Sequence, residues 1–228
     1  GSSSSFCVGL LNALYAFKGE SISKARLAEE AAHIEIDLLE RPIGKQDHYA
    51  AAIGGLNYVK FNSDDTTEIM PVSFKANITK AIFKNLHTFW TGIERDASIV
   101  LKEQDTNTIQ NTDLLLKIRS QALEFFDLSK KNIFNVETFG ESLDLGWKMK
   151  CQLAFNISNE FIDNAYSKAK ECGAIGGKIS GAGNGGFLNL IIKESSVQIV
   201  RKKMIELGLV YFPISSDTEG TSIITLGR

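Results

Sequence analysis

Two segments of this chain have the composition of phosphate-binding loops. The first is Gly1-Ser2-Ser3-Ser4-Ser5, which runs directly into an apolar stretch, and the second is Ser180-Gly181-Ala182-Gly183-Asn184-Gly185-Gly186. Small residues let a backbone pass close to a ligand. A helix that begins just after such a loop points unpaired N–H groups and the positive end of its dipole at an anion. The two loops therefore predict a site that holds phosphates.

The first loop has a plain alternative, because five such residues at the start of a chain can be the remnant of an expression tag. The stretch that follows, Phe6 to Phe17, has few polar positions, so we expect a helix that is buried nearly all round. A buried helix needs its first N–H groups satisfied. A serine-rich phosphate loop would meet that need and a tag would not, which favours the loop.

Glu35 stands on a face that otherwise looks directed at a core. The segment Lys24 to Leu39 has a helical period, in which Glu35 shares one face with Ala28 and Ala32. A buried charge without a partner is unfavourable. The pattern leaves three interpretations open: a core ion pair with Lys or Arg, an edge position, and a metal ligand or catalytic carboxylate.

Asp47 is a second carboxylate that could do chemistry. Pro42 and Gly44 end the preceding helix, and Asp47 precedes a short helical stretch that starts with His48 and Tyr49. The residue could simply cap that helix. The pattern alone does not separate a cap from a catalytic group.

Composition limits the function only broadly. The chain has 228 residues and a formal charge of −2, which suits one large or two small domains and gives no electrostatic case for nucleic acid or anionic membranes. Cys7, Cys151 and Cys172 lack metal-site spacing and predict free thiols. The longest apolar run is too short to cross a bilayer. Since no signal-peptide pattern is seen, we expect a cytoplasmic protein.

The elements that must position these residues form an α+β pattern. Strands are expected at 56–61, 86–90, 174–179, 187–192, 209–213 and 222–226, and helices at 113–127, 143–155 and 196–207. A further helix is expected to be capped by Ser158 and to stop at Gly173, and 62–68 to be a loop. The order helix-strand-strand-helix-strand near the end predicts helices layered on a mainly antiparallel sheet.

In this order, the segments resemble the GHMP superfamily of small-molecule kinases. Gly1 to Ser5 resembles the latter part of that superfamily's second motif, a phosphate loop ahead of a helix, and Lys178 to Gly186 resembles its third. Neither is a Walker loop, because no Gly-Lys-Ser/Thr follows the glycines.

Within the superfamily, the chain resembles D-glycero-D-manno-heptose 7-phosphate kinases. The resemblance rests on Pro42 to Ala52 with Gly54-Gly55, on Thr91 to Arg95, and on a third set that comprises Gly140 to Leu143, Trp147-Lys148, Ile157 to Asn159, Ile162-Asp163 and Gly173 to Lys178. His48 replaces the glutamine of the subgroup, and Asn184 interrupts the glycine run.

The resemblance implies ATP and Mg²⁺ as cofactors and assigns roles to residues. The nucleotide phosphates would contact Gly1, Ser2, Ser3, Ser4, Gly181, Ala182 and Gly183. Ser3, or Ser2, and Glu35 would bind the Mg²⁺, which takes oxygen ligands. Asp47 would be catalytic and would accept the proton of the attacking hydroxyl or only orient that hydroxyl.

For the phosphate already on the substrate, the resemblance implies Lys45, Arg95 and Gly181 as contacts, with Lys148 and Arg41 as weaker candidates. The planar fork of arginine suits phosphate. For each lysine, a solvated surface charge is an equally good interpretation. His48 is expected to line the site rather than to act as a base.

The resemblance further implies a GHMP kinase fold without the N-terminal strands of its first domain. Residues 1–85 would be the remainder of the N-terminal domain and 86–228 the C-terminal domain. The chain would thus be part of a longer kinase, and alone it is expected to phosphorylate poorly or not at all.

The function that follows is phosphorylation of the anomeric hydroxyl of a heptose 7-phosphate. Two alternatives remain: another sugar kinase of the L-fucose or galactose type, and a non-catalytic regulator that binds nucleotide or sugar phosphate. A pure binding module would need neither Glu35 nor Asp47.

Overall fold

The computed structural model describes residues 1–94, 97–131 and 134–224, which form two compact units. The first unit is Gly1–Val72 with Ser216–Arg228, and the second is Ser73–Ser215. Both units combine helices with antiparallel strands. The predicted α+β class is therefore confirmed.

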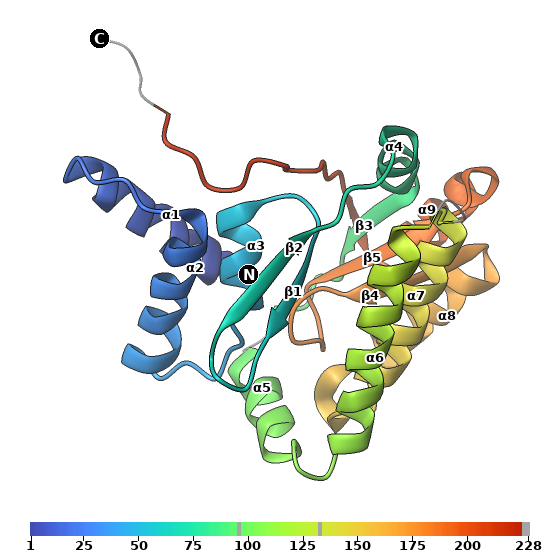
Figure 1. Ribbon diagram of the computed structural model, residues 1–228. Coiled ribbons are helices and arrows are strands. Elements are labelled where there is room, and N and C mark those ends of the chain that lie inside the picture. Colours follow the sequence, from blue (N-terminus) through green and yellow to red (C-terminus); the bar gives the residue numbers. More distant parts are fainter. Residues whose placement is uncertain (95–96, 132–133, 225–228) are drawn as a thin grey trace. The chain divides into compact units, whose positions relative to one another are not determined.

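The first unit is a cluster of helices beside a β-hairpin (Figure 1). Its elements are helices α1 (Ser2–Phe17), α2 (Lys24–His33), η1 (Ile34–Leu38) and α3 (Gln46–Ile53) and strands β1 (Asn57–Phe61) and β2 (Thr67–Pro71). The three α-helices pack on one another, and their shared core consists of Val8, Leu27, Ala28, Ala31, Tyr49 and Ala52. Val59 and Ile69 bring the hairpin onto this core.

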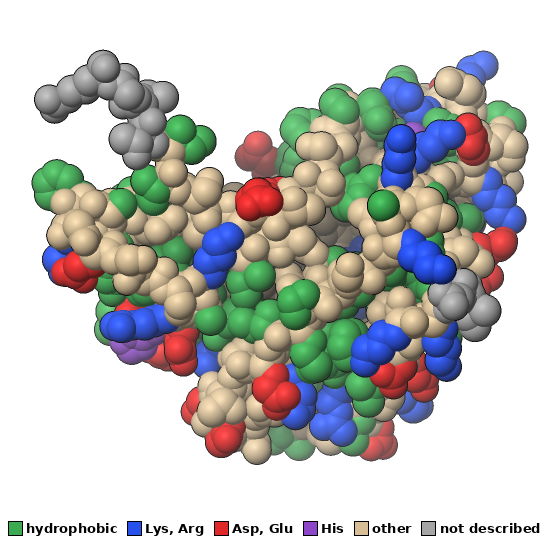
Figure 2. All heavy atoms as spheres, turned by 45° about the horizontal axis from the view of Figure 1, so that its top comes forward, with side chains coloured by type: hydrophobic (Ala, Val, Ile, Leu, Met, Phe, Trp, Pro, Cys, Tyr) green, Lys and Arg blue, Asp and Glu red, His purple; other side chains and the backbone are tan. Residues whose placement is uncertain are grey.

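Helix α1 is not buried all round, contrary to the expectation from its apolar sequence. Val8 is buried, whereas the exposed side carries Phe6, Leu10, Leu14 and Phe17, with Phe17 91% exposed. The reason is that α1 packs against α2 and α3 along one face only. Hydrophobic side chains reach the surface at several places in Figure 2, and between them basic and acidic side chains are interspersed.

The tail of the chain returns to the first unit and is fastened to the end of α3. The N–H of Thr221 donates to the carbonyl of Ala51 at 3.0 Å, and Asn12 donates to the Thr221 hydroxyl. A Cβ on Gly54 would lie 2.2 Å from the Gly220 nitrogen, so this crossing requires a glycine. Residues 222–224 do not form the predicted strand, and 225–226 lie outside the described residues.

The second unit is a four-stranded antiparallel sheet in the order β4-β5-β3-β6. Its strands are β3 (Leu86–Trp90), β4 (Ala174–Ile179), β5 (Phe187–Ile192) and β6 (Val210–Phe212). Its helices are α4 (Ala76–Asn85), α5 (Ala97–Thr106), α6 (Thr112–Ser129), α7 (Val136–Lys150), η2 (Phe155–Ile157), α8 (Glu160–Glu171), η3 (Glu194–Ser196) and α9 (Val197–Glu206). Helices α7, α8 and α9 pack on the sheet (Figure 1).

The strands β3, β4 and β5 have the bounds that the sequence predicts, because short apolar runs are set off there by glycine or polar residues. Strand β2 and helices α4 and α5 were not expected, and α7 begins seven residues before the predicted start. The cap of α8 is Asn159 rather than Ser158, because the Ser158 hydroxyl donates to Asp163 instead.

The predicted family boundary, between residues 85 and 86, stays a prediction. The compact units divide earlier, between Val72 and Ser73. The reason is that α4 packs against β3, β5 and α7 of the second unit. Across the described ranges, no helix combines the length and apolarity needed to span a bilayer.

Helix α7 and strand β4 meet through two glycines, and this contact yields a test of the packing. A Cβ on Gly176 would lie 2.0 Å from the carbonyl oxygen of Gly140, so Gly176→Ala must push α7 and β4 apart. We expect the free energy of unfolding to fall by about 1–3 kcal/mol in a urea titration.

Gly9→Ala is the matched control for that substitution. Its Cβ would meet nothing within 4 Å, and in a helix the change is expected to stabilise by about 0.5–1 kcal/mol. Equal unfolding midpoints for Gly176→Ala and the unsubstituted protein would contradict the packing described here.

Candidate active site

Glu35 lies in a π-helical turn at the end of α2. The N–H of Leu39 bonds to the carbonyl of Ile34 at 3.0 Å, which is the wider spacing of a π turn. Such turns are frequent at functional sites. The turn directs Glu35 inward, where only 4% of the residue is exposed.

The buried partner of Glu35 is His48, which the sequence did not predict. His48 Nε2 lies 2.8 Å from Glu35 Oε2, and His48 is 0% exposed. Glu35 is therefore not at an edge, and no Lys or Arg among the described residues pairs with it. The expectation that His48 lines the site is wrong, because the side chain is enclosed.

The charge of Glu35 also affects Cys7, a residue of helix α1. Burial, and after it the Glu35 carboxylate, raises the pKa of the Cys7 thiol above its ordinary value. The Cys7 Sγ lies 3.7 Å from the carbonyl oxygen of Ala31. The thiol therefore stays protonated and behaves as a packing group near the start of α1.

Asp47 is in the first turn of α3 and is not its cap, which is Lys45. Its Oδ2 lies 3.1 Å from the Gly1 nitrogen, and its side chain is 41% exposed. A Cβ on Gly1 would stand 3.1 Å from the same oxygen, so glycine permits this close approach. The structure thus brings the first loop and Asp47 together.

The serines of the first loop are already helical, since α1 begins at Ser2. The N–H of Ser5 bonds to the Gly1 carbonyl at 2.9 Å. Ser4 is buried, whereas Ser2 and Ser3 are exposed. The first-turn N–H groups of a helix have no partner within it, so this end of α1 can receive an anion beside Asp47.

The second loop, Ser180–Gly186, joins β4 to β5 and owes its shape to η2 and α8. Asn184 has a φ of 59°, a left-handed conformation that asparagine tolerates. Its N–H donates to the carbonyl of Ile157 at 2.6 Å, and its side chain accepts from Asn159 Nδ2 at 2.8 Å. Asn184 therefore anchors the loop where the glycine run is interrupted.

Gly181 is exposed in this loop, whereas Ala182 and Gly183 are buried. A Cβ on Gly183 would lie 2.4 Å from the Ile157 carbonyl oxygen. Nucleotide contact with Gly181, Ala182 and Gly183, and sugar contact with Gly181, stay predictions. The loop belongs to the second unit, whereas Glu35 and Asp47 belong to the first.

A row of polar side chains runs across the sheet to the second loop. Thr88 Oγ1 donates to Asn189 Oδ1 at 2.7 Å, and Asn189 Nδ2 donates to Ser180 Oγ at 2.6 Å. The row links β3 and β5 to the first residue of the loop. The sequence did not single it out, because its members come from three separate segments.

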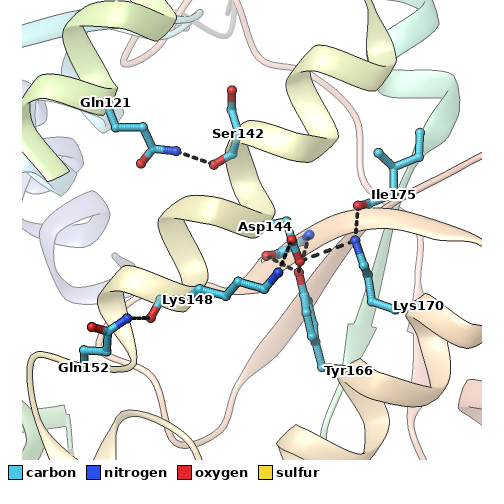
Figure 3. A network of polar contacts seen from close by, with 9 residues as sticks. Gln121, Ser142, Asp144, Lys148, Gln152, Tyr166, Lys170 and Ile175 are labelled. Atoms are coloured by element: carbon cyan, nitrogen blue, oxygen red, sulfur yellow. Dashed lines mark hydrogen bonds and ion pairs between the residues drawn. The ribbon is translucent and has the colours of Figure 1, made fainter. Parts of the chain in front are cut away.

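The strand that leads into the second loop is held by a polar network (Figure 3). Tyr166 of α8 donates to Asp144 Oδ1 of α7 at 2.7 Å, and the N–H of Gly177 in β4 donates to the Tyr166 hydroxyl at 3.1 Å. Lys148 and Lys170 pair with the same carboxylate, at 2.7 and 3.4 Å. One tyrosine thereby ties two helices to β4.

The pKa directions fit these contacts. Burial, and after it the bond to Asp144, raises the pKa of Tyr166, so its hydroxyl stays protonated and donates. Burial opposes ionisation of Asp144, but the hydrogen bonds from Lys148 and Tyr166 outweigh it and lower the pKa of the carboxyl. Lys148, a weaker substrate candidate, is thus engaged by Asp144.

The remaining substrate candidates differ in what surrounds them. The ammonium of Lys45 makes no hydrogen bond or ion pair with any residue the structure describes. In the sequence, Lys45 comes two positions before Asp47. Arg41 is exposed. Arg95 lies outside the described residues. Phosphate binding by these groups stays a prediction.

The donor set in the first unit suits Mg²⁺. Hydroxyl and carboxylate oxygens are hard ligands, and Mg²⁺ commonly takes only one or two protein groups besides nucleotide phosphates and water. Glu35 Oε1 accepts no hydrogen bond from any described residue, while Oε2 is occupied by His48. Within the described ranges, no three His, Cys, Asp or Glu side chains converge as a metal cage.

Comparison with models of known protein families shows which family this chain belongs to. The family model for the "GHMP kinases N terminal domain" matches residues 1–55, and the model for "GHMP kinases C terminal" matches residues 129–208. Together the two matches cover more than half of the chain. The chain belongs to the GHMP kinases. The first match contains the Gly1–Ser5 loop, Glu35 and Asp47, and the second contains Ser180–Gly186.

Among curated GHMP kinases, the D-glycero-alpha-D-manno-heptose 7-phosphate kinase of Campylobacter jejuni is 26% identical over 89% of this chain and 61% of the relative. The galactokinase of Pyrococcus furiosus is 23% identical over 92% of this chain and 65% of the relative. The chain thus spans less than two thirds of the length of these relatives.

Solved structures show the same fold. A D-glycero-D-manno-heptose 1-phosphate kinase from Bacteriodes thetaiotaomicron gives a TM-score of 0.64 at 22% identity, covering 97% of this chain and 63% of the other. The Streptococcus pneumoniae phosphomevalonate kinase gives a TM-score of 0.74 at 17% identity, covering 94% and 68%. The predicted GHMP kinase fold is confirmed.

The Tyr166 network supports a prediction on stability. Tyr166→Phe removes the donor to Asp144 and the acceptor for Gly177 N–H, and we expect a loss of about 1–3 kcal/mol in the free energy of unfolding. Tyr211→Phe is the matched control in the same unit, because the Tyr211 hydroxyl makes no hydrogen bond with described residues and its contact with Arg201 uses the ring. Equal losses of unfolding free energy in Tyr166→Phe and Tyr211→Phe would contradict a stabilising role of the Tyr166 hydrogen bonds.

The lowered pKa of Asp144 gives a pH prediction. The stabilisation from this carboxylate is fully present above the pKa of an unfolded aspartate and is lost as the pH falls through the lower folded-state pKa. The stability difference between the unsubstituted protein and Asp144→Asn should therefore be largest near neutral pH and shrink on acidification. Urea titrations at a series of pH values measure it, and a constant difference would exclude the ion pairs as its source.

Proposed function

We propose that the protein is an ATP-dependent sugar kinase that phosphorylates the anomeric hydroxyl of a heptose 7-phosphate. The observation that carries this proposal is the position of Asp47 beside Gly1, at the N-terminal end of α1. A carboxylate that is partly exposed next to unpaired helical N–H groups can meet a hydroxyl nucleophile where a phosphate is held.

In the proposed reaction, the bond from the anomeric oxygen to the γ-phosphorus forms while the bond from that phosphorus to the bridging oxygen of ADP breaks. The hydroxyl proton passes to Asp47, or Asp47 only orients the hydroxyl. The N–H groups of Ser2, Ser3 and Ser4 are proposed to hold nucleotide phosphate. Positioning and charge neutralisation supply most of the catalysis in phosphoryl transfer.

Mg²⁺, when bound, would neutralise charge on the transferring phosphoryl group, and Glu35 with Ser3 or Ser2 would hold it. The free Oε1 of Glu35 fits that role. Lys45 is proposed to meet the 7-phosphate, because its ammonium has no partner among the described residues and stands near Asp47 in the sequence. Arg95 is proposed as a second phosphate contact.

The name of the Campylobacter jejuni relative supports the choice of heptose 7-phosphate. The galactokinase similarity supports a second candidate, a kinase acting on an unphosphorylated sugar. Lys45 favours the phosphorylated substrate, because a cation that has no partner among the described residues and is two positions before Asp47 in the sequence suits a second phosphate. A non-catalytic regulator is the third candidate.

The test is ADP release by the full-length protein with ATP and Mg²⁺, against heptose 7-phosphate, free heptose, galactose and L-fucose. We expect activity with the phosphorylated heptose only. Asp47→Asn should lower kcat by roughly 10²–10⁴-fold, the usual contribution of acid–base catalysis.

Asp65→Asn is the matched control, because Asp65 is exposed and its φ of 63° is tolerated by asparagine. It should keep full activity. Turnover of a free sugar would favour the second candidate, and nucleotide binding without turnover of any sugar would favour the regulator.

A further inference from the structure

Among the described residues, Glu35 is the one polar partner of the His48 side chain. Its Nε2 lies 2.8 Å from Glu35 Oε2, and no described residue bonds its Nδ1, which is also buried. Since a carboxylate only accepts hydrogen bonds, Nε2 carries the hydrogen and donates. The imidazole leaves one buried nitrogen unsatisfied, which an apolar side chain of the same shape would avoid.

The geometry separates His48 from its neighbour Asp47. On α3, Asp47 is partly exposed beside Gly1, whereas His48 points into the protein and is 0% exposed. A fully enclosed imidazole cannot touch a substrate. Whatever His48 contributes to the site must act through Glu35.

Glu35 is held from two sides. Its backbone belongs to the π turn, where its carbonyl accepts from Arg41 N at 3.0 Å. Its Oε2 is fixed by His48, and Oε1 has no hydrogen bond from any described residue. Fixing one oxygen of a carboxylate and leaving the other open is how an outer group orients a metal ligand.

We propose that His48 is a positioning residue for the divalent cation of the nucleotide. It fixes the rotamer of Glu35 so that Oε1 faces the cation, and it is not a base. This inference rests on the proposed function, since it takes Glu35 as the cation ligand.

The test measures cation binding directly. Mn²⁺ replaces Mg²⁺ as the probe, and its dissociation constant is measured by electron paramagnetic resonance on the full-length protein with a non-hydrolysable ATP analogue. His48→Phe keeps the ring and removes the donor. We expect Mn²⁺ affinity to fall by roughly 10–100-fold, the usual effect of losing such a partner, with an unchanged KM for the sugar phosphate.

Two further variants separate positioning from packing. The amide nitrogen of His48→Gln can reach the place of Nε2, so we expect it to restore most of the Mn²⁺ affinity. His48→Asn is also polar but too short to reach Glu35 and should bind Mn²⁺ weakly. His33→Phe is the control, because His33 is exposed and contacts Asp37 instead.

Several outcomes would overturn the inference. If His48→Phe folds and binds Mn²⁺ as tightly as the unsubstituted protein, His48 does not position the ligand. If His48→Phe does not fold, equal affinities of the Gln and Asn variants would overturn it instead. If the three His48 variants lose stability equally and all bind Mn²⁺ as tightly as the unsubstituted protein, His48 only satisfies a buried carboxylate.

Glu35→Gln distinguishes this inference from the proposed function. Unchanged Mn²⁺ affinity in that variant would remove Glu35 as a ligand and with it both the metal role and the inference. A loss in Glu35→Gln without a loss in His48→Phe would overturn the inference alone. Weak Mn²⁺ binding by His48→Phe, in a protein that phosphorylates none of the sugars, would support the inference while the proposed substrate fails.

Discussion

The buried carboxylate of Glu35 is the constraint on which the arrangement of the first unit depends. A charge removed from water needs a partner, and here the partner is the imidazole of His48 on another helix. Their contact joins the turn at the end of α2 to α3, which carries Asp47 in its first turn. The contact that satisfies the carboxylate therefore holds the proposed cation ligand beside the helix that carries the proposed catalytic group.

Close backbone approach is the second constraint, and it recurs in both units. Gly54 and Gly220 let the tail cross the end of α3, and Gly176 lets β4 pass under α7. These contacts have no room for a methyl group, so they set the positions of backbone segments more tightly than flexible side chains would.

In the second unit, hydrogen bonds hold the Ser180–Gly186 loop in place. The Ser180–Gly186 loop is held by the carbonyl of Ile157 and the side chain of Asn159, and the strand before it is held by Tyr166 and Asp144 (Figure 3). A phosphate-binding backbone works best when its N–H groups are already oriented. For the proposed phosphate contacts, the packing around this loop would supply that orientation through hydrogen bonds from residues in or next to η2, α7 and α8.

The amino-acid sequence by itself determined the strands β3, β4 and β5, the glycine-rich loop Ser180–Gly186 and the place of Glu35 on the core-directed face of a helical segment. These features depend on short-range patterns: apolar runs, small residues and the helical period. Tertiary structure decided the rest. His48 meets Glu35 although the two residues are thirteen positions apart in the sequence, and the exposed side of α1 depends on which helices pack against it. Gly220 and Thr221 lie against the end of α3, and residues 222–224 do not pair as a strand. In each case the deciding contact joins segments that are distant in sequence, and no local pattern specifies which of them will meet.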